Sequence, residues 1–380
     1  MANHQTTPLV EDTAEALYVA FELSKAKWKL GFSDGSHRAA RVVTVDAPDV
    51  EAVDRQILKA KQSFGLREGA PVYSCYEAGR DGFWLHRALT DRGIDNLVVD
   101  PASIEVNRRK RRVKTDRVDA VKLLGQLIRY YRGERRVWAV VRVPSEQDEA
   151  ARQLHRELAV LRNERARHRM RIQSLLFAQG IRVQVGQGLL AALRTMRAWN
   201  GKALQQALQA RIVREHGRLE QVEAQIRVLQ QERRRLLTAS RGKNVQKVKR
   251  LVQLRGIGLE SAWVFSMELF AWRQFANRRE LAGAVGLTPT PYSSGDTERQ
   301  QGVSKIGNKR VRTLLVEIAW VWLRYQPDSA LSRWFNERFA AGGARLRRIG
   351  IVALARKLLI ALWRFVEYGV IPEGARLKMV

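Results

Sequence analysis

The pattern of hydrophobic and polar positions divides the chain into three stretches. In the first, short apolar runs alternate with helical patterns; strands are predicted at residues 17–21, 28–32, 41–45, 72–76 and 96–99, and helices at 48–64, 83–92 and 116–131. Three strands joined by short turns, followed by strands separated by helices, are typical of a mixed sheet. The pattern therefore predicts an α/β domain over residues 1–145.

The sequence after Pro144 and Ser145 is rich in charged residues and leucine, and its pattern predicts two long helices within residues 146–245. Each helix carries an apolar stripe, at spacings that include three, four and seven: Leu154, Leu158, Leu161, Ile172 and Leu175 on the first, and Ile212, Leu219, Val222, Ile226, Leu229 and Leu236 on the second. Residues 180–201 would connect them. The stripes fit an antiparallel hairpin, an intermolecular coiled coil, or packing against the body of the protein.

The third stretch, residues 246–380, predicts a mainly helical C-terminal domain rich in tryptophan. The tryptophans lie at positions 263, 272, 320, 322, 334 and 363. Aromatic residues at helical spacing favour a buried core over a surface that stacks on nucleic-acid bases.

The charge of the chain is strongly positive, and this indicates a polyanionic partner. Lys and Arg number 68 against 38 Asp and Glu, which gives a formal net charge of +30. The basic residues are spread along the whole length, and no Lys/Arg cluster adjoins a hydrophobic span. DNA or RNA is therefore favoured over a membrane surface.

Cysteine and histidine usage argues against a soft-ligand metal site. Cys75 is the only cysteine, and the six histidines lack zinc-ligand spacing. Residues 1–15 have no basic and apolar leader, and the apolar stretch 349–371 is interrupted by charges. We expect a cytoplasmic protein that does not enter a membrane.

Four acidic residues are candidates for one metal site. Asp116 and Asp119 lie three residues apart in the first turn of a predicted helix, with Thr115 as its N-cap. Glu77 ends a predicted strand, and Glu22 interrupts the first one. A site with only oxygen ligands predicts Mg²⁺ or Mn²⁺, the ions that enzymes use to cleave phosphodiesters. The alternative is a helix-terminus acid at Asp116 and an edge-strand charge at Glu22.

A basic run directly precedes the aspartate pair, where a phosphate backbone would approach the metal site. It contains Arg108, Arg109, Lys110, Arg111, Arg112 and Lys114. An ordinary solvated basic loop is the alternative interpretation.

Two further pieces of the last third suggest phosphate contacts. Gly256 and Gly258 have the spacing of a helix-hairpin-helix turn, whose backbone amides can hold a phosphate. A predicted loop over 286–295 carries Ser293 and Ser294, either of which could attack phosphorus, although most loop serines do not. The segment that follows predicts a phosphate-gripping turn that opens a basic helix, with Lys305, Asn308, Arg310 and Arg312 as its contacts.

Taken in order, these motifs resemble the DEDD transposases of insertion sequence one-ten and its relatives, which include the Piv-type DNA invertases. The matching pieces span nearly the whole chain: Tyr-Val-Ala-Phe-Glu-Leu-Ser-Lys at 18–25, Tyr-Glu-Ala-Gly at 76–79, Lys-Thr-Asp-Arg-Val-Asp-Ala at 114–120, Arg-Gly-Ile-Gly at 255–258, Ser-Ser-Gly at 293–295 and Ser-Lys-Ile-Gly-Asn at 304–308.

The resemblance implies an N-terminal domain similar to RuvC and ribonuclease H, a coiled-coil segment over 146–245, and a C-terminal transposase domain. It implies that Glu22, Glu77, Asp116 and Asp119 bind magnesium and that Ser294 forms a covalent phosphoserine with DNA. It also implies a bridge RNA that selects the DNA, and a homo-oligomer, a dimer or tetramer, whose subunits share each active site.

Two points of this resemblance stay open. The family has aspartate at the first acidic position, whereas this chain has Glu22, whose extra methylene displaces the carboxylate by roughly an ångström. The choice between Ser293 and Ser294 rests only on the neighbouring Gly295. A metal-dependent nuclease or junction resolvase, which would activate water with the same acids, and a catalytically inactive nucleic-acid binder are the alternative functions.

Overall fold

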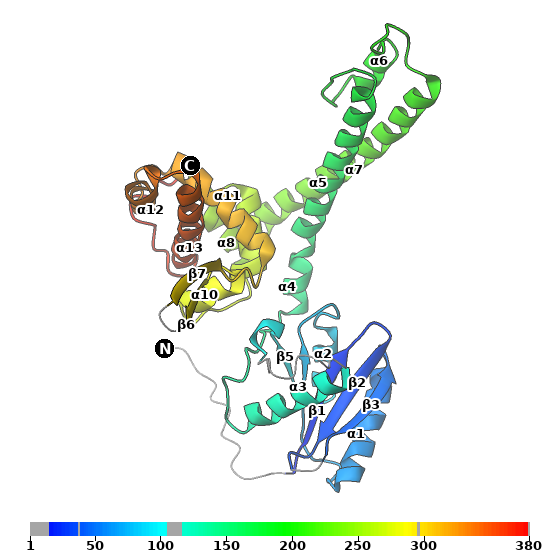
Figure 1. Ribbon diagram of the computed structural model, residues 1–380, viewed down its shortest axis with the longest axis vertical. Coiled ribbons are helices and arrows are strands. Elements are labelled where there is room, and N and C mark those ends of the chain that lie inside the picture. The colour runs from blue at the N-terminus through cyan, green and yellow to red at the C-terminus, as the bar shows by residue number, and fades with distance from the viewer. Residues whose placement is uncertain (1–14, 37–38, 105–115, 295–296, 379–380) are drawn as a thin grey trace. The chain divides into compact units, whose positions relative to one another are not determined.

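The computed structural model describes residues 15–36, 39–104, 116–294 and 297–378, without the side chains of Asp116 and of residues 291–301. The chain forms two compact units, Met1–Val143 and Pro144–Val380. Each is considered by itself below, with the elements labelled in Figure 1.

The N-terminal unit is built on a five-stranded mixed sheet. Its strands are β1 (Leu17–Leu23), β2 (Lys27–Ser33), β3 (Arg41–Asp46), β4 (Val72–Glu77) and β5 (Asp95–Val99), in the order β3-β2-β1-β4-β5. The first three strands pair antiparallel, whereas β1, β4 and β5 pair parallel. This confirms the predicted α/β domain with a mixed sheet.

Helices cover both faces of this sheet (Figure 1). On one face, α1 (Val50–Phe64) and α2 (Trp84–Thr90) pack on a cluster that includes Leu17, Val19 and Phe21 of β1. On the other face, α3 (Asp116–Tyr131) packs on Ala20 and Cys75. A short 3-10 turn, η1 (Pro101–Ser103), follows β5. The α3 face is the one that matters for the candidate site.

The second unit begins with a long antiparallel pair of helices. The elements are α4 (Glu146–Ala151), α5 (Gln153–Phe177), α6 (Leu189–Leu193) and α7 (Gln206–Ala239). Leu158 and Leu161, early in α5, pack on Val222 and Ile226, late in α7. The end of α5 packs on the beginning of α7 through Ile172, Leu176, Ile212 and Leu219. Of the three predicted arrangements, the structure therefore has the hairpin within one chain (Figure 1).

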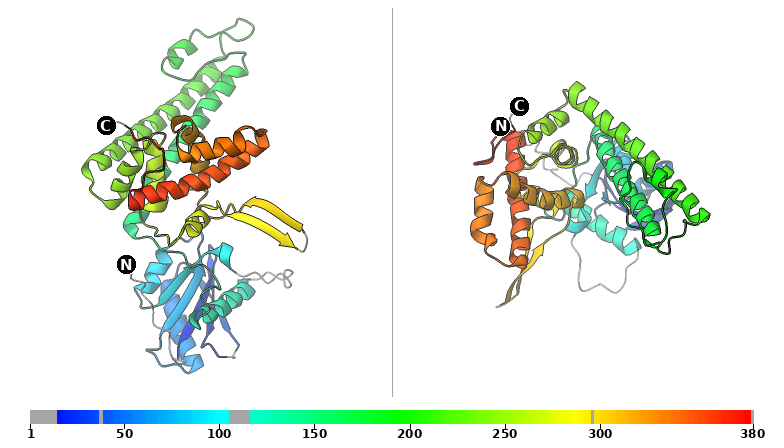
Figure 2. Two further views of the ribbon diagram at one scale, coloured as in Figure 1. Left: turned by 90° about the vertical axis from the view of Figure 1, so that its left-hand side faces the viewer. Right: turned by 90° about the horizontal axis from the view of Figure 1, so that it is seen from above.

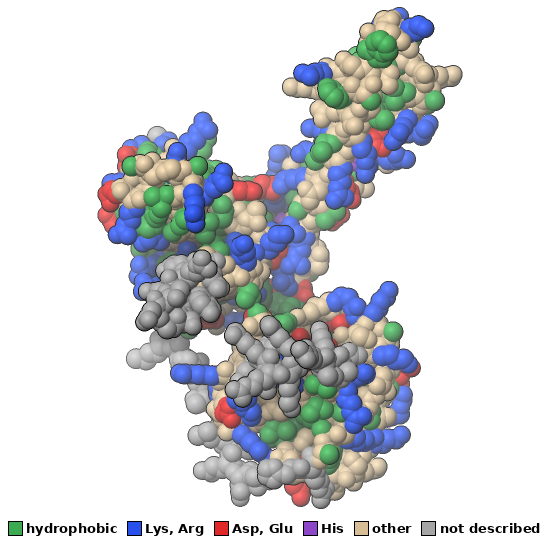
Figure 3. All heavy atoms as spheres, in the orientation of Figure 1, with side chains coloured by type: hydrophobic (Ala, Val, Ile, Leu, Met, Phe, Trp, Pro, Cys, Tyr) green, Lys and Arg blue, Asp and Glu red, His purple; other side chains and the backbone are tan. Residues whose placement is uncertain are grey.

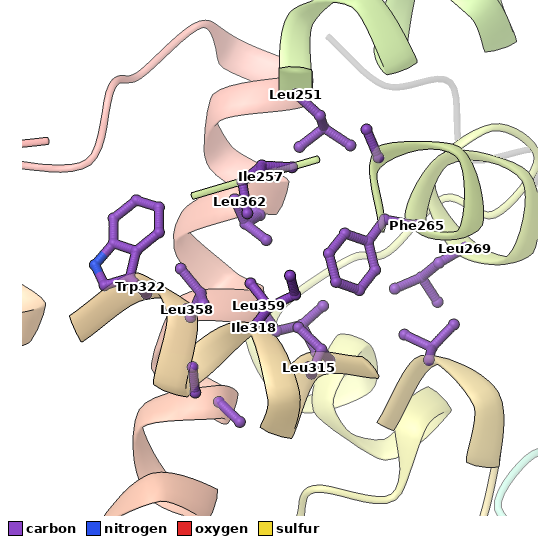
Figure 4. Packing of buried hydrophobic residues seen from close by; sticks show 14 of the residues in the cluster. Leu251, Ile257, Phe265, Leu269, Leu315, Ile318, Trp322, Leu358, Leu359 and Leu362 are labelled. Atoms are coloured by element: carbon purple, nitrogen blue, oxygen red, sulfur yellow. The ribbon is translucent and has the colours of Figure 1, made fainter. Parts of the chain in front are cut away.

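The C-terminal part is mainly helical, as predicted. It comprises α8 (Lys243–Val252), α9 (Leu259–Phe265), the π-helix η3 (Ser266–Phe270), α10 (Arg278–Val285), α11 (Lys309–Tyr325), α12 (Ala330–Phe335), the π-helix η4 (Asn336–Ala340) and α13 (Ala344–Tyr368). Figure 4 shows side chains of α8, α9, α11 and α13 converging in one core, among them Leu251, Phe265, Leu315, Trp322 and Leu359. Trp263 and Trp272 are also buried, whereas Trp320 is exposed.

One local prediction was wrong. The predicted loop that carries the two serines is a strand, β6 (Pro289–Ser294), which pairs antiparallel with β7 (Thr297–Val303). Figure 2 shows this two-stranded hairpin projecting from the helical body of its unit. Among the described residues, no helix is both long enough and apolar enough to cross a bilayer.

Candidate active site

The parallel pairing of β1 with β4 brings two of the predicted acids to neighbouring positions. The paired residues run from Leu17 with Val72 to Phe21 with Tyr76, so that Glu22 and Glu77 directly follow the last pair. Neighbouring parallel strands lie about 4.8 Å apart. Two acids that are far apart in sequence, Glu22 and Glu77, are therefore neighbours at one end of the sheet.

Both glutamates belong to the face of the sheet that α3 covers. Successive side chains of a strand alternate between the faces, and Ala20 and Cys75, two positions before Glu22 and Glu77, pack against α3. Glu22 is half-buried and Glu77 is exposed. The two carboxylates therefore stand where the packed core of this face gives way to solvent.

The first turn of α3 reaches the same region. Ala120 lies against Gly31, where an added Cβ would be 3.4 Å from the Ala120 carbonyl oxygen. Gly31 pairs with Ala20 of β1. Asp119, the residue before Ala120, is half-buried, and Asp116 begins the helix. The fold thus brings Glu22, Glu77 and the beginning of α3 to one face of one sheet.

The donor set consists of carboxylate oxygens, which fits a hard divalent cation. In the described part of the chain, no three His, Cys, Asp or Glu side chains are grouped closely enough to hold a metal ion. The side chain of Asp116, Thr115 and the basic run with Arg108, Arg109, Lys110, Arg111, Arg112 and Lys114 lie outside the described residues. Metal binding by the four acids stays a prediction.

The only cysteine lies beside this site but is unsuited to metal binding. Cys75 is fully buried. Burial raises the pKa of its thiol well above the ordinary value, and the negative charge of Glu77 raises it further. A protonated thiol is a poor metal ligand, so the carboxylates remain the candidate donors.

The serine hairpin of the second unit has a rigid base. The segment 304–308 follows β7 and is hydrogen-bonded to the end of α10 and to the residues that connect α10 to β6. Ser304 N donates to Thr288 O at 2.9 Å, Lys305 N to Gly286 O at 3.1 Å, and Asn308 N to Ala284 O at 2.9 Å. Ser294 ends β6, opposite Thr297. These bonds close the hairpin at the end opposite the serines.

Two glycines allow this close approach. Gly286 and Gly307 have φ values of +70° and +90°, and an added Cβ on either would collide with backbone, of Ile306 and Ala284 respectively. Lys305 also has a positive φ, of 58°, which is uncommon for a residue with a side chain. Gly307 of the motif at 304–308 is therefore required by packing.

The predicted phosphate-gripping turn does open a helix. Asn308 caps α11, because its side chain accepts from Val311 N at 3.1 Å. Lys305, Lys309 and Arg310 are exposed near this terminus, whereas Arg312 donates to the Val285 carbonyl at 2.9 Å. The exposed cations are accessible to an anion, whereas Arg312 contributes to the fold.

The Gly-Ile-Gly element joins α8 to α9. Gly256 has a φ of +85° and approaches α11, where an added Cβ would be 3.4 Å from the Cβ of Tyr325. Gly258 is the N-cap residue of α9. The predicted turn between two helices is thus present, and its first glycine is favoured by the positive φ at that position.

Sequence reasoning missed a buried polar cluster in the same unit. Glu268 is 2% exposed and binds His155, Arg156 and Asn308. The signal was an acid inside the apolar run from Ala262 to Phe270, since an unpaired charge would not be buried there.

Comparisons with known proteins identify relatives of this chain. Residues 248–334 match the model of the transposase IS116/IS110/IS902 family. The chain is 41% identical over 376 residues to the putative transposase y4rJ of Sinorhizobium fredii, across 96% of this chain and 95% of that protein.

More local similarity extends to other transposases. Over 125 residues, 32% of this chain and 36% of the relative, it is 30% identical to the transposase for insertion sequence element IS1328 of Yersinia enterocolitica. Over 116 residues, 30% and 31% of the two chains, it is 31% identical to the transposase for IS1111A of Coxiella burnetii. The chain therefore belongs to the IS116/IS110/IS902 transposase family.

Proposed function

We propose that this transposase cleaves and rejoins DNA strands with two sets of groups: Glu22, Glu77, Asp116 and Asp119 hold Mg²⁺ or Mn²⁺, and Ser294 is the nucleophile. The observation that carries the proposal is the register of β1 and β4, which sets Glu22 beside Glu77 on the face where α3 begins. We further propose that this unit is RuvC-like, which its mixed five-stranded sheet supports.

The bound cations would polarise the scissile phosphodiester and stabilise charge on its oxygens. The Ser294 hydroxyl would lose its proton as its Oγ bonds to phosphorus, while one bridging P–O bond breaks and the released strand oxygen takes up a proton. In the second half, a strand hydroxyl would displace Ser294 from phosphorus and restore the free serine. The exposed Lys305 and Arg310 would attract the phosphate backbone.

The partners of this reaction are proposed from charge and from the resemblance of the motifs. Figure 3 shows Lys and Arg side chains over much of the visible surface, which suits a nucleic-acid partner. We propose DNA as substrate, a guide RNA encoded by the same element, and a dimer or tetramer in which subunits share sites.

A covalent protein–DNA adduct tests the serine. The protein, expressed with the noncoding segments that flank its gene, is incubated with labelled DNA and Mg²⁺ and separated under denaturing conditions. We expect an adduct that Ser294→Ala abolishes and Ser293→Ala, the matched control, leaves in place. The reverse pattern would move the nucleophile to Ser293.

The same assay separates the alternative functions. A nuclease or resolvase would still cut DNA after Ser294→Ala. An inactive nucleic-acid binder would give no product, and Asp116→Ala would leave its DNA affinity unchanged. Glu22→Asp addresses the departure from the family pattern: a parent without an adduct and a variant with one would locate the defect at Glu22.

A further inference from the structure

Glu268 lies at the junction of three segments that are distant in sequence. It belongs to the π-helix η3, its side chain is 2% exposed, and its Oε1 accepts from His155 Nε2 and from Arg156 Nε, both at 2.8 Å. Its Oε2 accepts from Arg156 Nη2 at 3.0 Å and from Asn308 Nδ2 at 3.1 Å. One carboxylate thus joins α5 to the residue that caps α11.

This carboxylate is ionised and its bonds are charge-assisted. Burial alone would raise its pKa, but the hydrogen bonds from His155 and Arg156 hold the pKa of Glu268 well below the ordinary value for glutamate. Hydrogen bonds to charged groups are stronger than those between neutral groups, and losing one partner of a buried set is costly. The amide of Asn308 is therefore held firmly.

Asn308 links Glu268 to the base of the serine hairpin. Its Nδ2 donates to Glu268, so its Oδ1 is left to accept from Val311 N. Its backbone N–H donates to Ala284 O, within the closed base formed by 304–308 and the end of α10. Rotation of the side chain amide would break the cap and the link together.

We infer that Glu268 is a positioning residue for strand transfer. Through Asn308 it fixes the segment 304–308, which includes Lys305, at the base of the hairpin that carries Ser294, and it ties this base to α5. The inference rests on the proposed function. Glu268 acts through Asn308 and has no direct role toward DNA.

The chain offers a matched control on the neighbouring helix. Glu260 of α9 also ties the C-terminal body to the helical hairpin, because it accepts from Arg162 Nη1 at 2.6 Å and pairs with Arg233 of α7. Within the described part of the chain, Glu260 binds Arg162 and Arg233 and makes no hydrogen bond or ion pair to the segment 304–308. Replacing either glutamate would weaken the contact between the C-terminal body and the helical hairpin. Only the replacement of Glu268 would also release the segment 304–308.

The experiment uses the full-length parent, Glu268→Gln, Asn308→Asp and Glu260→Gln. Asn308→Asp keeps a good N-cap for α11 but removes the amide donor to Glu268, and so tests the link even if Glu268→Gln folds poorly. Hydrogen exchange of a peptide covering 304–312 reports the order of the base without DNA. The rate of adduct formation, measured at increasing DNA concentrations, gives the maximal rate and the half-saturating DNA concentration separately.

We expect faster exchange of 304–312 and a maximal rate lowered about 10- to 100-fold in Glu268→Gln and Asn308→Asp, as for a misplaced reacting group. Half-saturating DNA should stay unchanged in Glu268→Gln. Glu260→Gln should leave both readouts near the parent's. Unchanged exchange in both linked variants, or equal losses in Glu260→Gln, would overturn the inference. If neither the parent nor Glu22→Asp forms a serine adduct, but the expected exchange shifts occur, the result would support the link and overturn the phosphoserine proposal.

Discussion

Replacing Gly307 by alanine should destabilise the second unit, because two independent costs fall on one added methyl group. The φ of +90° is disfavoured for an L-residue by roughly 1–2 kcal/mol. The new Cβ would also press on the Ala284 carbonyl, with its carbon at 2.8 Å. Because backbone cannot yield as a flexible side chain does, we add the roughly 1–3 kcal/mol typical of overpacking. The sum is about 2–5 kcal/mol, a large part of the usual stability of a domain.

Gly302→Ala is the matched control for this change. Gly302 has nearly the same φ, +92°, but no described atom lies within 4 Å of the position of its Cβ. It should therefore cost only the roughly 1–2 kcal/mol of the backbone conformation. Hydrogen exchange of α10 and α11 at increasing urea concentrations measures both free energies of opening. If Gly307→Ala lowers the free energy no more than Gly302→Ala does, the argument from close backbone approach is refuted.

Three further predictions concern the other parts of the chain. Glu77→Gln should lower Mg²⁺-dependent DNA cleavage by about 10²-fold or more in a gel assay, as expected for loss of an electrostatic group at the reacting centre, whereas Asp46→Asn, at an exposed acid at the end of β3, should not; equal activity of both variants would remove Glu77 from the site. Burial would raise the pKa of Glu215, but hydrogen bonds from one histidine and two arginines outweigh this and lower the pKa from 4.5 to about 2. The contribution of Glu215 to stability is therefore present above pH 4.5 and is lost as the pH falls toward 2. Helical circular dichroism should decrease over that window, and Glu215→Gln should flatten the decrease. Ile172→Ala, at a fully buried position of the hairpin, should cost about 2–5 kcal/mol in urea-dependent hydrogen exchange of α5 and α7, while Met170→Ala, 67% exposed, should cost little; similar costs would contradict the packing.

The elements of the N-terminal unit could be predicted because its strands and helices differ in hydrophobic period. Alternation of short apolar runs with helical patterns located β1, β4 and α3 closely, including the start of α3 at Asp116. The pairing of β1 with β4 could not be derived in this way, since it depends on which strands are neighbours in the sheet. The spacing of the acids and their positions in the predicted elements suggested one group of four, and the strand register gives a physical reason for the position of two of them.

The serine segment was predicted as a loop because Pro289 and Pro291 lack the N–H that a central strand requires. In a two-stranded ribbon, each strand has a free edge, so proline is tolerated there. The cluster around Glu268 was missed for another reason: its partners His155 and Asn308 are 113 and 40 residues away in sequence. Only tertiary structure shows that such residues meet.

The antiparallel hairpin of α5 and α7 restricts how the chain can change length. The 34 residues of α7 rise about 50 Å, and its apolar face is covered by α5 of the same molecule. Seven residues inserted into one helix alone would leave two turns of apolar surface facing water. Insertions and deletions here should therefore occur in matched pairs, one in each helix, so that longer and shorter arms arise as coupled events in related chains.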